Sequence, residues 1–304
     1  MNSKTFTIAD VCAGIGGFIQ AFENLGGNCV FSSEIDKFAR KTYEANYGVV
    51  PSGDILKILL KNIPYHDIFT CGFPCQPYSL AGLRRGLADV RSEIFYGIIR
   101  ILDVVKPQVF FLENVKRLLS DDKGRTFKFM LDALQNSGYY VSYKVLDSRQ
   151  FVPQHRERLY IVGFRKQVNF EFPVLSGHCP KLQDILEDNV SDKYTLSDNT
   201  WNSLQRHRNR HEKKGNGFGY GIAGVNGTTR TLLARYYKDG SDILINQVGK
   251  NPRKLTPREC ARLMGYSDQF KIVCSDTQAY KQFGNSVVIP VVARIAKEIV
   301  SFLD

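Results

Sequence analysis

The first two thirds of the chain alternate short runs of β-branched and aromatic residues with longer amphipathic stretches. Because parallel strands need a helical crossover between them, this alternation predicts an α/β fold with a mostly parallel sheet and helices on both faces. The expected strands are Phe6–Val11, Cys29–Ser33, Asp67–Cys71, Val109–Glu113, Tyr140–Val145 and Leu159–Phe164. The expected helices include Gly17–Leu25, Ser92–Val105, Thr126–Ser137, Thr256–Met264 and Pro290–Leu303.

The pattern changes after about Pro173. Residues 174–252 are polar, basic and rich in glycine, above all at Gly215–Gly221, which predicts a loop-built, partly β recognition domain. A helical pattern returns at Thr256, where Thr256 and Glu259 form a capping box with Pro257 as first helical residue. We therefore expect an enzyme-like body at residues 1–173 and 265–304, and a smaller recognition domain at residues 174–264.

The positive charge is concentrated in this second region. The chain carries a net charge of +11, and residues 201–262 hold thirteen Lys/Arg against four Asp/Glu, a balance of +9. Such a patch favours a polyanionic partner, nucleic acid above all, over a merely solvated basic surface.

Other sequence features exclude whole classes of protein. No apolar run approaches the roughly 20 residues of a membrane helix, and no signal region precedes the first strand, so we expect a soluble, cytoplasmic protein. Seven cysteines without paired metal spacing argue against a disulfide framework and a zinc site.

A glycine-rich turn follows the first strand at Asp10–Phe18 and opens a helix. Glycines there let a ligand approach the backbone, and the helix start offers free N–H groups. Glu34 ends the second strand, where a carboxylate can accept both ribose hydroxyls, and Asp54-Ile55 can hold an adenine edge. These residues predict a site for an adenosine-containing cofactor, and the glycine spacing disfavours NAD.

A thiol stands at the end of the third expected strand, in Gly72-Phe73-Pro74-Cys75-Gln76. An α/β enzyme presents a nucleophile at such a strand end, whereas an isolated Cys75 is as readily interpreted as a small buried hydrophobe. The following stretch, with Arg84 and Arg85, suits a mobile lid with phosphate-seeking arginines.

Glu113 and Asn114 end another apolar strand, and Gln154–Arg158 precede the last one. A desolvated acid at a strand end can protonate a ring nitrogen, although Glu113 alone is equally compatible with a capping or ion-paired role. Of the two arginines, one is a candidate for a carbonyl oxygen and one for orienting the acid. The alternative for that segment is an exposed strand start.

Taken in order, the blocks Asp10–Phe18, Gly72–Gln76, Glu113–Val115, Gln154–Arg158, Arg253–Tyr266 and Gln282–Val287 resemble those of the bacterial cytosine-5 DNA methyltransferases. The resemblance covers essentially the whole chain except the basic insert. It implies a Rossmann-like methyltransferase sheet, S-adenosylmethionine as cofactor and double-stranded DNA as substrate. It also allows a cognate restriction endonuclease that acts on the same site, and it implies a monomer without a metal.

The resemblance assigns roles by position. Cys75 attacks cytosine C6, Glu113 protonates N3, Arg158 binds O2 of the flipped base and Arg156 supports the same pocket; Asn114 is expected to be a scaffold residue. The implied cofactor residues are Cys12, Ala13, Gly14, Gly16, Glu34, Ile35, Asp54, Ile55, Pro74 and Asn285. Cys12 and Ile35 depart from the family, which usually has aromatic side chains against the adenine at both positions.

The implied DNA-binding residues are Ser79, Arg84, Arg85, Arg230, Arg235 and Lys238. The insert is similar to recognition domains of enzymes that modify C-C-W-G-G, C-C-N-G-G or C-C-G-G, so a CC/GG-type target methylated at the inner cytosine is expected. Arg230, Arg235 and Lys238 are the side chains suited to reading guanine, with phosphate contact as the alternative. A transfer-RNA cytosine-5 methyltransferase and a catalytically silent DNA-binding relative are the competing hypotheses.

Overall fold

The computed structural model describes residues 5–73, 90–177, 179–217 and 219–303. The chain forms two compact units. The first unit contains the residues up to Leu146, then Glu157–Leu175 and the residues from Ile289 onward, and the second contains Asp147–Arg156 and Ser176–Val288. Residues 265–288, which the sequence assigns to the enzyme-like body, thus pack within the second unit.

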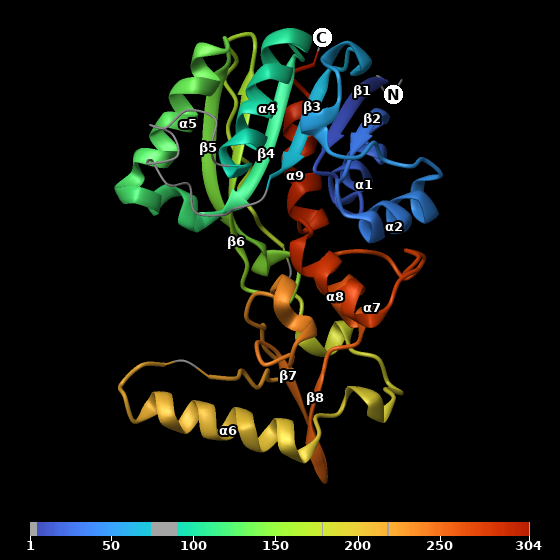
Figure 1. Ribbon diagram of the computed structural model, residues 1–304, viewed down its shortest axis with the longest axis vertical. Coiled ribbons are helices and arrows are strands. Elements are labelled where there is room, and N and C mark those ends of the chain that lie inside the picture. The colour runs from blue at the N-terminus through green and yellow to red at the C-terminus, as the bar shows by residue number, and fades with distance from the viewer. Residues whose placement is uncertain (1–4, 74–89, 178, 218, 304) are drawn as a thin grey trace. The chain divides into compact units, whose positions relative to one another are not determined.

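A six-stranded sheet organises the first unit (Figure 1). Its order is β2-β1-β3-β4-β6-β5; β1, β2, β3 and β4 run parallel, and β6 is antiparallel to β4. The bounds are β1 Phe6–Val11, β2 Gly27–Ser33, β3 Ile68–Gly72, β4 Val109–Val115, β5 Tyr140–Asp147 and β6 Glu157–Phe164. The expected mostly parallel α/β sheet is confirmed, and each predicted strand end lies within two residues of the observed one.

Helices cover both faces of this sheet (Figure 1). They are α1 Gly17–Glu23, α2 Lys37–Tyr47, α4 Val90–Val105, α5 Arg125–Asn136 and α9 Ile289–Val300. Helix α5 ends one residue before the expected Ser137, and Gly138 follows with a φ of 86°, in the left-handed region that glycine tolerates. None of the helices within the described ranges has the length and apolar character needed to span a lipid bilayer.

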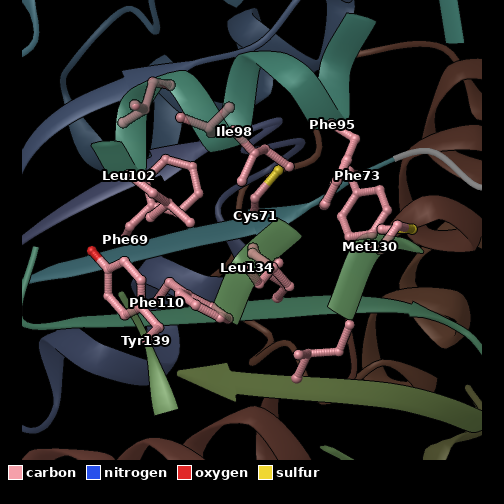
Figure 2. Close-up of a cluster of buried hydrophobic side chains, with 14 of the residues drawn as sticks. Phe69, Cys71, Phe73, Phe95, Ile98, Leu102, Phe110, Met130, Leu134 and Tyr139 are labelled. Atoms are coloured by element: carbon pink, nitrogen blue, oxygen red, sulfur yellow. The ribbon is translucent and has the colours of Figure 1, made fainter. Parts of the chain in front are cut away.

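The core between β3, β4 and the helices α4 and α5 is apolar and closely packed. Figure 2 shows Phe69, Cys71 and Phe73 of β3 and its end facing buried side chains of both helices. On the opposite face, Phe18 of α1 meets Phe111 of β4 edge to face at 5.2 Å between ring centroids. Each fully buried large side chain contributes roughly 1.5–3 kcal/mol, so this core holds the strand ends in place.

The described part of the second unit contains a short antiparallel hairpin and the α-helices α6, α7 and α8 (Figure 1). Their bounds are β7 Leu244–Gln247, β8 Lys250–Lys254, α6 Asp198–Glu212, α7 Pro257–Leu263 and α8 Asp276–Asn285. The capping box of Thr256 and Glu259 and the position of Pro257 at the start of α7 are confirmed. Tyr236 ties the unit together, because its hydroxyl donates to Ile243 O at 2.6 Å and accepts from Leu255 N at 2.8 Å.

Helix α6 corrects the expectation that the insert is built from loops and strands. It is a 15-residue helix without a single buried residue, and Ser197 caps it by accepting from Thr200 N. A helix that is polar on all sides lacks the apolar periodicity by which amphipathic helices are detected. The signal that was available is the Ser197 cap followed by a run free of proline and glycine up to Gly215.

Candidate active site

The glycine-rich turn lies at the carboxyl ends of β1 and β2. Ala13 N donates to Ser33 O at 2.9 Å, which ties the turn to the end of β2. Gly16 has a φ of 85°, and a Cβ on it would lie 2.2 Å from the ring of Tyr47. Glycine is therefore required for the close approach of α2 to the start of α1.

Glu34 is held against this turn by the backbone. Its carboxylate accepts from Gly14 N and from Asp36 N, both at 2.8 Å. Burial raises the pKa of Glu34, and the two N–H groups oppose that rise. The remaining lone pairs of the Glu34 carboxylate are suited to accept hydrogen bonds from the two hydroxyls of a ribose.

Four other expected cofactor residues, Cys12, Ile35, Asp54 and Ile55, follow the ends of β1 and β2 in the same unit. Glu34 N donates to Ser52 O at 2.8 Å, which places the segment before Asp54 beside the end of β2. Asp54 caps a 3₁₀ turn, Ile55–Lys57, through Leu56 N. Ile35 is 73% exposed, an apolar surface suited to stack on a planar ring, and Cys12 is half-buried. The carboxylate acceptors of Glu34 and Asp54 and the exposed apolar side chain of Ile35 fit an adenosine moiety.

Asp10 is a fully buried acid at the end of β1. Thr70 Oγ1 donates to its Oδ1 at 2.8 Å, while its Oδ2 has no hydrogen-bond partner among the described residues. Burial raises the pKa of Asp10 to about 7, the bond from Thr70 lowers it, and the charge of Glu34 raises it. At neutral pH this carboxyl therefore titrates inside the protein.

We expect Asp10→Asn to change the pH dependence of stability. The folded chain keeps the proton of Asp10 up to about pH 7, whereas the unfolded chain loses it near its ordinary pKa of 3.8. The folded state therefore binds more protons in this interval, and stability falls as pH rises from 4 to 7. Asparagine keeps an acceptor for Thr70 and removes the charge, so the variant should be about 4 kcal/mol more stable than wild type at pH 8.

The measurement is urea unfolding at pH 5 and pH 8. The variant should be more stable than wild type by about 2 kcal/mol at pH 5 and by about 4 kcal/mol at pH 8. A gap of the same size at both pH values would contradict the titration of Asp10. Asp67→Asn is the comparison, because Asp67 is a half-buried carboxylate of the same sheet with donors on both oxygens.

Glu113 and Arg158 form the charged pair of the site. They lie on neighbouring antiparallel strands, where Glu113 pairs with Tyr160 and Val115 with Arg158. Arg158 Nε is 3.2 Å from Glu113 Oε1, and the side chains are only 12% and 11% exposed. This geometry presents a carboxyl and a guanidinium side by side at the end of β4. A planar ring bound there could receive a proton from the carboxyl and a hydrogen bond from the guanidinium.

The chain that leads to Cys75 is anchored beside this pair. Gly72, the last residue of β3, pairs with Glu113 in the parallel register. Asn114 is buried, and its Nδ2 donates to Phe73 O at 3.1 Å. This contact agrees with the expected scaffold role of Asn114. Cys75 itself lies outside the described residues, as do Pro74, Ser79, Arg84 and Arg85.

Arg156 and Asn285 belong to the second unit. Arg156 is buried and donates to three backbone carbonyls, Leu232 O at 2.9 Å, Gly284 O at 3.1 Å and Ser286 O at 2.9 Å. These contacts make Arg156 a cross-link between three segments of that unit, and its catalytic role stays a prediction. Asn285 is exposed at the end of α8. The expected DNA-reading side chains Arg230, Arg235 and Lys238 are all exposed on the second unit.

Comparison with known proteins identifies the family. A model of the C-5 cytosine-specific DNA methylases matches residues 6–301. Type II methyltransferase M.NlaX of Neisseria lactamica is 51% identical over 307 residues, covering 98% of this chain and 97% of the relative. Type II methyltransferase M.SsoII of Shigella sonnei is also 51% identical, covering 98% of this chain and 81% of the relative.

Solved structures show the same fold. The Entamoeba histolytica methyltransferase EhMeth superposes with a TM-score of 0.83 at 21% identity, covering 99% of both chains. The S. pombe Dnmt2 methyltransferase has a TM-score of 0.81 at 21% identity, covering 97% of this chain and 98% of that one. These likenesses concern the fold alone. On the family match and the full-length relatives, the chain belongs to the C-5 cytosine-specific DNA methylase family and is a DNA cytosine-5 methyltransferase.

Proposed function

We propose that this enzyme flips a cytosine out of duplex DNA, activates it with Cys75 and methylates its C5. The observation that supports this most directly is the Glu113–Arg158 pair at the end of β4, next to the strand that leads to Cys75. S-adenosylmethionine, held by Glu34 and the turn around Gly14, supplies the methyl group. The first unit performs the chemistry, and the second unit reads the DNA.

The chemistry explains the residue types. Cytosine C5 is too poor a nucleophile to accept a methyl group unaided. Addition of the Cys75 thiolate to C6, with proton donation to N3 by Glu113, makes C5 part of an enamine that can attack. Transfer of the C5 proton to a base then allows the thiolate to leave, and N3 returns its proton to Glu113. Arg158 holds O2 and orients Glu113. The base must leave the stack first, at a cost of about a few kcal/mol.

Covalent trapping tests this function. A duplex with 5-fluorocytosine at the target should form a stable adduct with the protein, because fluorine cannot be removed as a proton is. Labelled cofactor should transfer its methyl group to duplex DNA and not to transfer RNA. Adduct formation with transfer RNA alone would overturn the proposal, and absence of any adduct would identify a silent DNA-binding relative.

We further propose a target of the CC/GG type, methylated at the inner cytosine, as part of a Type II restriction–modification pair. The basis is the resemblance of the insert, and relatives named as Type II methyltransferases cover nearly the full chain. Bisulfite sequencing of plasmid DNA from cells that express the protein would reveal the methylated sequence. Conversion-resistant cytosines in any other context would overturn the proposed target while leaving the enzymatic activity established.

Helix α6 carries a cationic stripe suited to the DNA backbone. We define the α6 stripe as Arg206, Arg210 and the C-cap residue Lys213, which share one face at helical spacing and are exposed. Within the described residues, none of the three has an acidic partner. On the opposite face the charge of Arg208 already has partners within the protein. Arg208 donates to Glu212 at 2.7 Å and lies 5.0 Å from the ring centroid of Tyr220. A one-sided row of free cations fits phosphates.

We expect neutralising the α6 stripe to weaken DNA binding uniformly across sequences. The triple variant Arg206→Gln, Arg210→Gln, Lys213→Gln should reduce the slope of log affinity against log salt by about 2–3, roughly one per lost phosphate contact. Affinities for target and unrelated duplexes, measured from 50 to 200 mM salt, test this. The charge-matched control is Lys61→Gln, Lys128→Gln, Lys144→Gln in the first unit, all exposed. Equal slopes for both triple variants would contradict the role of α6.

A further inference from the structure

A pocket in the second unit is lined by Arg230, Asp242 and several glycines. Its volume is about 530 Å³, and its lining includes Gly219, Gly221 and Arg208 as well. A Cβ on Gly221 would lie 2.8 Å from Asp242 O and 3.2 Å from Arg230 Nε. The missing side chain is therefore what allows this backbone to pass between the arginine and the aspartate.

One exposed arginine pairs with the carboxylate of Asp242, and a second lines the same pocket. Arg235 Nη2 lies 3.8 Å from Asp242 Oδ1, with Arg235 70% and Asp242 19% exposed at their side chains. Arg230 shares the pocket with Asp242, and its Nη1 donates to Gly219 O at 3.0 Å. Burial raises the pKa of Asp242, and the charges of Arg235 and then Arg230 oppose that rise. One largely covered carboxylate is thus paired with Arg235 and lies within the electrostatic influence of Arg230.

Such a carboxylate changes what the arginines can do. A freely rotating exposed arginine adapts to any phosphate. A guanidinium that is paired with a carboxylate on one side presents its remaining N–H donors in one fixed direction. Guanine offers O6 and N7 to such a fork in the major groove, and a pre-oriented side chain loses less entropy on binding. The partial neutralisation by Asp242 also reduces the attraction of the pair to phosphates.

We propose that Asp242 is a positioning residue for target recognition, which holds Arg230 and Arg235 so that they read guanine in the DNA major groove. The inference rests on the proposed function and deepens it, because it assigns sequence discrimination to a carboxylate that does not itself contact a methylated base. Asp242 acts through the arginines, so its loss should affect discrimination more than binding.

The test compares Asp242→Asn with wild type on the methylated duplex identified by bisulfite sequencing. Each guanine of the site is replaced in turn by 7-deazaguanine, which lacks the N7 acceptor. Wild-type kcat/KM should fall about 5- to 100-fold at the guanines that are read, the range of one bidentate base contact. Asp242→Asn should lower kcat/KM on the natural site about tenfold, bind an unrelated duplex at least as tightly as wild type, and respond less than threefold to 7-deazaguanine.

The matched control is Asp239→Asn. Asp239 lies in the same loop and its removal changes the charge equally, yet its carboxylate accepts from Ser241 N at 2.9 Å, a bond that asparagine retains. This control should keep wild-type discrimination, and Asp242→Glu should restore part of it.

Several outcomes would overturn the inference. One is full sensitivity of Asp242→Asn to 7-deazaguanine, and another is the same loss in Asp239→Asn. If wild-type kcat/KM does not fall with 7-deazaguanine at any guanine, the inference is also overturned. This result needs only the wild-type protein, so it can be obtained even if Asp242→Asn does not fold. A wild-type chain that methylates no duplex would instead overturn the proposed function, and the inference with it.

Discussion

Cys75→Ser is expected to abolish methyl transfer. The hydroxyl of serine stays protonated at neutral pH and is a far weaker nucleophile than a thiolate, so turnover should fall by at least about 10⁴-fold. The variant should also form no covalent adduct with 5-fluorocytosine DNA. Its affinity for duplex DNA should change less than about threefold, because the basic surfaces that bind phosphates are untouched.

The structure gives this prediction its physical basis. Gly72 pairs with Glu113, and Asn114 binds the carbonyl of Phe73, so the chain is fixed beside the acid two residues before the thiol. Radiolabelled methyl transfer and adduct formation on denaturing gels are the measurements. Cys179→Ser is the matched control, since Cys179 is the exposed thiol of the described residues and should be dispensable. Turnover that survives in Cys75→Ser would refute the covalent mechanism.

Arg253→Ala is expected to destabilise the second unit by about 3–5 kcal/mol. Arg253 donates to both oxygens of Glu259 at 2.8 Å, and Glu259 is completely buried. The same carboxylate accepts from Thr256 N at 2.8 Å and Glu187 N at 3.0 Å, so it joins three segments of that unit. Removal of the guanidinium leaves a buried charge without its counterion.

Urea unfolding of the full chain, followed by the fluorescence of Trp201 in the same unit, measures this loss. Lys250→Ala is the control, because Lys250 pairs with Asp192 at 2.6 Å while both side chains are more than half exposed. An exposed pair contributes roughly 0–1 kcal/mol. Similar losses in Arg253→Ala and Lys250→Ala would show that burial does not set the strength of the Arg253 pair.

Local patterns predicted the enzyme body well and the insert poorly. The strands are short apolar runs bounded by polar residues, and the capping box at Thr256 is a contact between neighbours in sequence, so both are readable without a structure. Helix α6 was missed because its periodicity is not hydrophobic. Asp242 was missed because nothing near it in sequence shows that Arg235 turns toward it.

The sequence by itself determined the family and the positions of the strands in the first unit, and it predicts the cofactor class and the reactive thiol. These follow from residue types and short spacings. Glycine and proline set local backbone angles, and polar residues directly after an apolar run mark where a strand ends. Only the tertiary structure decided that Glu113 meets Arg158, that Gly14 holds Glu34, and that Asp10 is buried with a raised pKa. Such contacts join residues far apart in the chain, and sheet register and packing fix them.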